Sequence, residues 1–156
     1  MGREIVDDEN GAATELGYIF TFLLGVLLLT AFGVWAYEIE TSTREKWNEA
    51  VVTQNMDLLA NAVERADQAS RLDPQVMYAE SVVWSQSEED EGDMTLKLTE
   101  TGLELNHRTG PLDQTRSISG TGTGTHAGEF NLGGVEQIWI IYKDGVTKIS
   151  TANPGF

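Results

Sequence analysis

The chain contains no cysteine, and this absence excludes disulfide frameworks, thiolate zinc sites and cysteine nucleophiles together. Histidine is nearly absent as well, with 2 residues, and no serine elbow or metal-ligand spacing accompanies them. A catalytic triad needs a nucleophile, a base and a group that orients the base, and the sequence nominates no such set. The sequence therefore predicts a protein that is not an enzyme and has no cofactor.

Basic residues are scarce, with 10 lysines and arginines against 25 acidic residues and a formal net charge of −15. An acidic surface repels phosphate backbones, so the sequence argues against nucleic acid as a partner. A strongly acidic chain with few lysines suits a solvated surface in high salt, where screening reduces self-repulsion. The 156 residues suffice for one small domain and an anchor.

One uninterrupted apolar run, Leu16 to Tyr37, lies between Glu15 and Glu38 and carries no charge in its 22 residues. A helix of that length spans about 33 Å, which matches the hydrocarbon core of a bilayer. The run is too long and its start too acidic for a cleaved secretory signal. Residues 15–38 are therefore predicted to form a transmembrane or filament-core helix.

Residues 1–14 precede this run as a polar, acidic leader or tail, and residues 39–73 follow it with an amphipathic helical pattern. The predicted apolar stripe comprises Trp47, Val51, Val52, Met56, Leu58, Leu59, Ala62, Val63, Ala66 and Ala69. Acidic residues, Asp57 and Asp67 among them, are assigned to other faces. The run Thr41–Thr43 is the weakest point of a continuous helix, and Asp73–Pro74 should end it.

Residues 74–156 alternate apolar and polar side chains and predict an antiparallel β domain, which makes the chain α+β. Hairpins are expected around Thr101–Gly102 and at Asp144–Gly145, and another short strand near Ile118. Residues 119–128 are rich in glycine and threonine and are interpreted as a flexible loop.

Three features of the β region could carry chemistry. The acidic loop 87–93 could attract calcium, but its spacing is not that of an EF-hand, so no metal site is assigned. The segment from Gly120 to Gly124 lacks the following lysine and helix of a phosphate-binding loop. His107 and His126 are interpreted as polar surface histidines.

The order of segments resembles type IV pilins, and more narrowly the small pilin-like membrane proteins of halophilic archaea. The stretch GAATELGYIFTFLLGVLLLTAFGV carries the resemblance at the level of motif. In that family a prepilin peptidase removes the leader near a glycine, which Gly11 matches by position, and a glutamate near the new N-terminus pairs with a neighbouring subunit, which Glu15 matches. Glu9–Asn10 stands where the family usually has a basic residue, so whether the leader is cleaved stays open.

The resemblance implies a major or minor subunit of an archaeal surface filament. Its partners would be membrane lipid, copies of itself or other pilin-like subunits, and a prepilin peptidase. Gly17, Gly25 and Gly33 are eight residues apart and would allow close helix packing. The alternative is a permanently anchored, single-pass accessory or binding subunit of a membrane or cell-surface complex.

The orientation in the membrane is open, because two lines of reasoning conflict. Arg44 and Lys46 follow the apolar run while only Arg3 precedes it, which by the positive-inside rule places the β domain in the cytoplasm. The glycine- and threonine-rich composition of that domain instead favours an extracytoplasmic location, at the cell membrane or in a surface filament.

Overall fold

The computed structural model describes the backbone of residues 4–156 apart from residues 121 and 123, and the side chains from residue 14 onward with the same two gaps. Helix α1 (Glu4–Leu72) comes first, and the strands and a single 3-10 turn, η1 (Glu91–Asp93), follow it. The chain divides into two compact units, Met1–Thr43 and Arg44–Phe156. The fold confirms the predicted α+β class, with one long apolar helix and a small, mostly antiparallel β domain.

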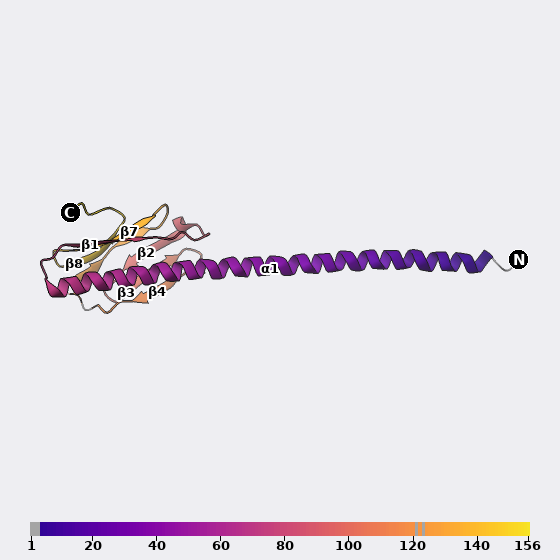
Figure 1. Cartoon of the computed structure of the whole chain (residues 1–156), viewed down its shortest axis with the longest axis horizontal. Helices are drawn as coiled ribbons and strands as arrows, with labels where there is room; N and C mark the ends of the chain where they lie inside the picture. Colours follow the sequence, from indigo (N-terminus) through magenta and orange to yellow (C-terminus); the bar gives the residue numbers. More distant parts are fainter. Residues whose placement is uncertain (1–3, 121, 123) are drawn as a thin grey trace. The chain divides into compact units, whose positions relative to one another are not determined.

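Helix α1 continues without a break through Thr41–Thr43, the predicted weak point (Figure 1). The hydroxyls of Thr41 and Thr43 donate to the carbonyls of Tyr37 and Ile39, at 3.0 and 2.7 Å. These side chains therefore bond back to the preceding turn and leave the helical ladder intact. The helix ends at Leu72, as Asp73–Pro74 predicts.

The strands of the second unit form two sheets, with the orders β1-β7-β8-β5 and β4-β3-β2-β6. Among the described strands, all pairings are antiparallel except that of β5 with β8, which is parallel. The strands are β1 (Tyr78–Val83), β2 (Met94–Leu98), β3 (Gly102–His107), β4 (Gln114–Ser117), β5 (Thr125–Ala127), β6 (Glu129–Asn131), β7 (Gln137–Lys143) and β8 (Val146–Ser150). The predicted hairpins are confirmed as β2–β3 and β7–β8.

Gly128 joins the two sheets, because β5 pairs in the first sheet and β6, one residue later, pairs in the second. Its φ of +136° suits only glycine. A Cβ at this position would lie 2.6 Å from Ile149 Cγ1 and 2.8 Å from the Ile149 carbonyl oxygen. The chain turns here from one sheet to the other, and the corner leaves no room for a side chain.

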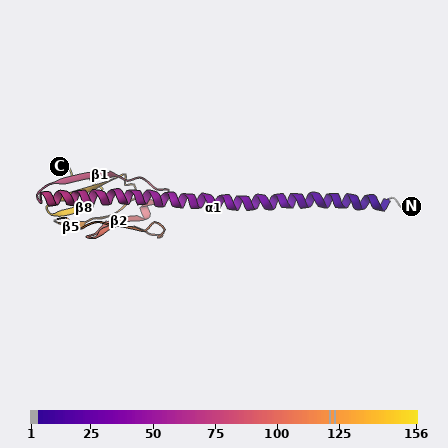
Figure 2. The ribbon, with the colours of Figure 1, turned by 60° about the horizontal axis from the view of Figure 1, so that its bottom comes forward.

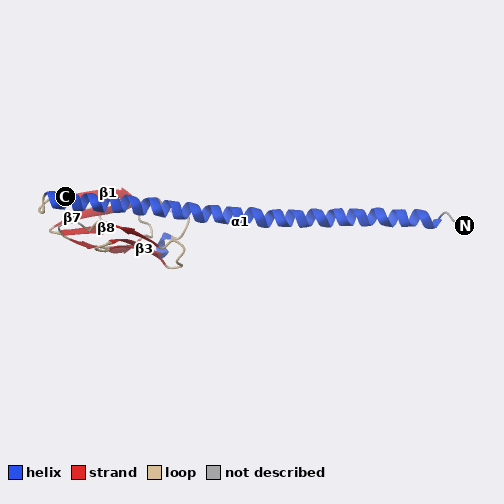
Figure 3. Ribbon diagram, turned by 90° about the horizontal axis from the view of Figure 1, so that it is seen from below, coloured by secondary structure: helices blue, strands red, loops and turns tan. Residues whose placement is uncertain are grey.

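The core of the second unit forms between the strands and one face of α1. Figure 3 shows the strands gathered beside the C-terminal part of the helix. The buried helix side chains are Val52, Met56, Leu59, Ala62, Val63 and Ala66. The sheets contribute, among others, Leu96, Leu103, Leu105, Ile138, Ile140 and Tyr142, and Leu132 joins them from the loop after β6. The predicted stripe is thus correct in part, because Trp47 and Leu58 are 49% and 43% exposed.

The strands at two edges of the sheets are tied to α1 by ion pairs. Arg65 contacts Glu80 of β1 at 2.5 Å, and Arg116 of β4 contacts Asp57 at 2.6 Å. The hydrogen bond from Arg65 holds the pKa of Glu80 below its usual value, against the opposing effect of burial. Figure 2 shows β1 on one side of the last turns of α1 and β2 and β5 on the other. The helix is thus held by an ion pair to a strand of each sheet, as well as by the packing of its apolar face in the core.

The segment 119–128, expected to be a flexible loop, contains the whole of β5. The strand expected near Ile118 is β4, which ends one residue earlier at Ser117, and β6 has no counterpart among the expected strands. Isolated three-residue strands carry too few alternating positions to be recognised from periodicity.

Candidate functional site

The apolar part of α1 is the most unusual surface of the chain. All side chains from Leu16 to Tyr37 are exposed in the structure, among them Phe20 at 71% and Leu29 at 73%. Among the described residues, one helix is long enough and apolar enough to cross a membrane, and it lies near the N-terminus. None of the residues in its most apolar window is buried by the rest of the chain.

The threonine hydroxyls and the backbone groups within the apolar run are satisfied locally. The hydroxyls of Thr21 and Thr30 donate to the carbonyls of Gly17 and Val26, both at 2.9 Å. A helix satisfies its own backbone groups, which is the requirement for a segment surrounded by hydrocarbon. The run therefore presents an apolar surface whose backbone groups and threonine hydroxyls need no water.

The helix-packing glycines Gly17, Gly25 and Gly33 all lie in this run. A Cβ added at any of them would meet no atom within 4 Å. Contacts within this chain therefore do not require glycine at these positions. Their predicted role in packing against another helix stays a prediction.

Gly11, matched to leader processing, and Glu15, matched to pairing with a neighbouring subunit, lie in the N-terminal part of α1. Glu15 is exposed. Gly11 belongs to residues 4–13, which are described as helix but whose exposure is not described. The structure does not bring Gly11, Glu15 and the three glycines together into a compact site; they follow one another along the helix.

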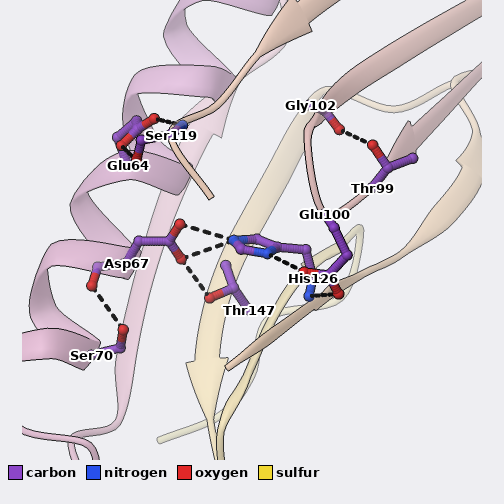
Figure 4. A network of polar contacts seen from close by, with 9 residues as sticks. All are labelled: Glu64, Asp67, Ser70, Thr99, Glu100, Gly102, Ser119, His126 and Thr147. Atoms are coloured by element: carbon purple, nitrogen blue, oxygen red, sulfur yellow. Dashed lines mark hydrogen bonds and ion pairs between the residues drawn. The ribbon is translucent and has the colours of Figure 1, made fainter. Parts of the chain in front are cut away.

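A second polar site lies in the β-bearing unit, where α1, β5, β8 and the β2–β3 turn meet (Figure 4). His126 Nε2 lies 3.0 and 2.9 Å from the two carboxylate oxygens of Asp67. On the other side of the ring, Nδ1 lies 3.1 Å from Glu100 Oε2. The backbone N–H of His126 donates to Glu100 Oε1, and the Thr147 hydroxyl donates to Asp67 Oδ1, both at 3.0 Å.

The surroundings of this cluster differ sharply between its members. The side chains of His126 and Asp67 are 1% and 0% exposed, whereas that of Glu100 is 61% exposed. Burial acts to lower the pKa of His126, but hydrogen bonds to Glu100 and Asp67 outweigh it and raise the pKa above its ordinary value. The hydrogen bonds from His126 lower the pKa of Glu100.

The prediction that His107 and His126 lie on the surface is wrong. Both are buried, at 6% and 7% exposure. Asp67, assigned to a polar face of the helix, is fully buried as well. The reason is that β5 and β8 cover this end of the helix, and the histidine supplies a charged partner for a carboxylate that would otherwise be costly to bury.

The His126 cluster is not arranged as a catalytic base. Each ring nitrogen already faces a carboxylate, so neither is free to accept a proton from a nucleophile. The arrangement can hold a charge and join elements, which is a positioning role.

The acidic loop 87–93 is organised by hydrogen bonds to its neighbours. Glu91 accepts from Trp84 Nε1 and from the backbone of Ser87, both at 3.0 Å. Asn48 of α1 accepts from the backbone of Glu88 at 2.9 Å. In the part of the chain that the structure describes, no cluster of three or more histidines and acidic residues could hold a metal ion.

Comparison of the chain with protein-family models, with curated proteins and with solved structures finds no match in any of the three. The functional argument therefore depends on the residues themselves.

Proposed function

We propose that this chain is a pilin-like structural subunit, which assembles into a surface filament through its apolar N-terminal helix. The single observation that supports this most is that every side chain from Leu16 to Tyr37 is exposed in the isolated chain. Such a surface must be covered by lipid or by other apolar helices. Membrane lipid would cover it before assembly, and helices of neighbouring subunits would cover it in the filament.

The second unit supports a structural role. Its core is packed against α1, and the polar cluster around His126 joins elements of the fold without leaving a free ring nitrogen. A domain held rigidly on one helix is suited to display on a filament or membrane surface. We therefore propose a role in assembly and not in catalysis.

The alternative is a permanently anchored, single-pass subunit of a membrane complex. The observation that favours it is the acidic and polar pair Glu9–Asn10 before Gly11. A peptidase that reads a basic residue at this place would not process such a leader. The same apolar helix would then remain in lipid.

Intact-mass measurement of the native protein separates the two. The filament proposal expects a chain shortened near Gly11, and it expects Gly11→Val to prevent the cleavage while Gly17→Val, six residues further on, does not. Negative-stain imaging of the native material should then show fibres. A chain that retains Met1 and purifies as discrete membrane particles would contradict the filament and favour the anchored subunit.

A further inference from the structure

Three parts of the second unit meet at the ring of His126: the end of α1, the turn between β2 and β3, and strand β5. Asp67 approaches Nε2 from the helix, and Glu100 approaches Nδ1 from the turn. The ring itself belongs to β5, which has three residues and pairs only with β8 among the described strands. A side chain with two carboxylate partners thus fastens β5, whose parallel pairing with β8 is three residues long.

The proton count of the ring decides how many of these contacts are hydrogen bonds. A doubly protonated imidazole donates from both nitrogens, so both carboxylates are satisfied. A neutral ring has one N–H, and its other nitrogen would turn a lone pair toward a carboxylate oxygen. One of the two contacts must then become repulsive.

The burial of the two carboxylates indicates which contact is lost. Asp67 is fully buried, so leaving its charge without the His126 N–H, and with the Thr147 hydroxyl as its remaining described side-chain donor, carries a large penalty. Glu100 is 61% exposed and can exchange the ring for water. The neutral ring therefore keeps its proton on Nε2, toward Asp67, and gives up Glu100.

We propose that His126 is a protonation-dependent latch. With both ring nitrogens protonated, it holds β5 to both α1 and the β2–β3 turn, and in its neutral form it releases the turn. The inference does not depend on the proposed filament, because every group in it lies within the second unit.

Among the residues that the structure describes, the other groups packed around the ring do not replace this switch. From β8 the cluster receives the uncharged hydroxyl of Thr147. Glu64, which precedes Asp67 by three residues on α1, is engaged by the hydroxyl of Ser119 at 2.6 Å. Within β5 itself the neighbours of His126 are Thr125 and Ala127, which do not titrate.

The direction of the pH effect follows from the raised pKa of His126. A group whose pKa is higher in the folded than in the unfolded state contributes stability that is fully present below the unfolded value. That stability is lost as the pH rises through the folded value. The contribution of His126 to the latch is therefore fully present below the usual pKa of a histidine, and the latch opens as the pH rises through the raised pKa of His126.

The lowered pKa of Glu100 sets the acid limit of the pH range in which the latch is closed. Its contribution is present above the usual pKa of a glutamate and is lost as the pH falls through the folded value. The latch is strongest between these two titrations.

The test is an NMR titration of the full-length chain in detergent micelles. The His126 ring signal is identified by its disappearance in His126→Gln, and its midpoint is followed together with the backbone amides of residues 99–101 and of β5. We expect these amides to shift with the same midpoint as the ring. Glu100→Gln should move that midpoint to lower pH, whereas His107→Gln should leave it unchanged.

Two results would overturn the latch: a midpoint that Glu100→Gln does not move, or amides of the turn that do not follow the ring. Asp67→Asn should also move the midpoint to lower pH and by more. If that variant does not fold, Glu100→Gln decides alone, because the exposed Glu100 side chain can be replaced without opening the core.

Discussion

Helix α1 is one uninterrupted element, yet its two parts on either side of Thr43 differ in what covers them. In the first part, the apolar side chains from Leu16 to Ile39 lie on all faces of the helix and each is exposed. In the second part, apolar residues form one face, and the chain's own strands bury Val52, Met56 and Leu59 to about 1% exposure or less. The same secondary structure thus supports two different surfaces.

The difference comes from the interleaving of polar residues. Between Glu15 and Glu38 there is no charged residue, so no face of the helix is suited to water. After residue 43, charged side chains return at intervals that leave a single apolar face. The first part is exposed, which is the basis of our proposal that it is covered from outside the chain, and the apolar face of the second part packs on its own domain.

The largest expected effect is on the cover of the first part. The double variant Leu24→Arg, Leu28→Arg places two charges near the middle of the apolar run. Each costs about 2.5–3.5 kcal/mol at the centre of a membrane helix, so insertion should weaken by at least about 5 kcal/mol. The measurement is the fraction of chain that stays with carbonate-washed membranes.

The matched control is the double variant Gln54→Arg, Gln68→Arg, at exposed positions of the second part. It should remain in the membrane fraction like the unaltered chain. Equal retention of both double variants would break the distinction between the two parts.

The next effect concerns the core of the second unit. Leu59 is fully buried, so Leu59→Ala should lower the free energy of unfolding of the β domain by about 2–5 kcal/mol. Leu28→Ala removes the same atoms from an exposed position and should change it by less than about 0.5 kcal/mol. Denaturant unfolding in detergent, followed by near-ultraviolet circular dichroism, compares them. A similar loss of stability in both variants would show that the β domain also packs against the first part of the helix.

Substituting a glycine in each unit should give a smaller difference in the free energy of unfolding of the β domain. Gly128→Ala forces a Cβ against Ile149 at a φ that only glycine tolerates, and should destabilise the domain by about 1–3 kcal/mol. Gly25→Ala meets open space in a helix and should leave the domain unchanged. The same unfolding experiment measures both, and an unaffected Gly128→Ala protein would contradict the tight corner between the sheets.

The smallest effect is expected at the edges that fasten the second part. Arg116→Gln removes a partly exposed ion pair with Asp57 and should lower the free energy of unfolding by about 0.2–1 kcal/mol, less in high salt. Lys97→Gln removes a longer contact of 3.7 Å between two strands and serves as the control. If the two variants are equally stable at low salt, the Arg116–Asp57 ion pair adds nothing to the attachment of β4 to the helix.

Much of the fold is predictable from local signals. The apolar run, the end of the helix at Asp73–Pro74 and the two hairpins each depend on neighbouring residues, and the structure has all of them. The parallel pairing of β5 with β8 depends on contacts between distant segments. Glycine- and threonine-rich sequence around β5 carries no periodic pattern that would reveal it.

The polar cluster around His126 cannot be predicted from neighbouring residues either, because it also depends on contacts between distant segments. Asp67 on a helix next to other acidic residues has the pattern of a solvated side chain. Its burial becomes understandable only when His126, 59 residues away, is placed against it. A lone histidine in a low-complexity segment was the one available signal, and it has no specificity by itself.

The most direct test of the external cover is cysteine scanning, which the natural lack of cysteine makes possible without background. Phe22→Cys and Leu27→Cys probe the first part of α1, and Glu49→Cys and Gln54→Cys probe exposed positions of the second. In native membranes or filaments, a membrane-impermeant maleimide should label the second pair rapidly and the first pair only after denaturation. Equal labelling of both pairs in the native state would contradict the account.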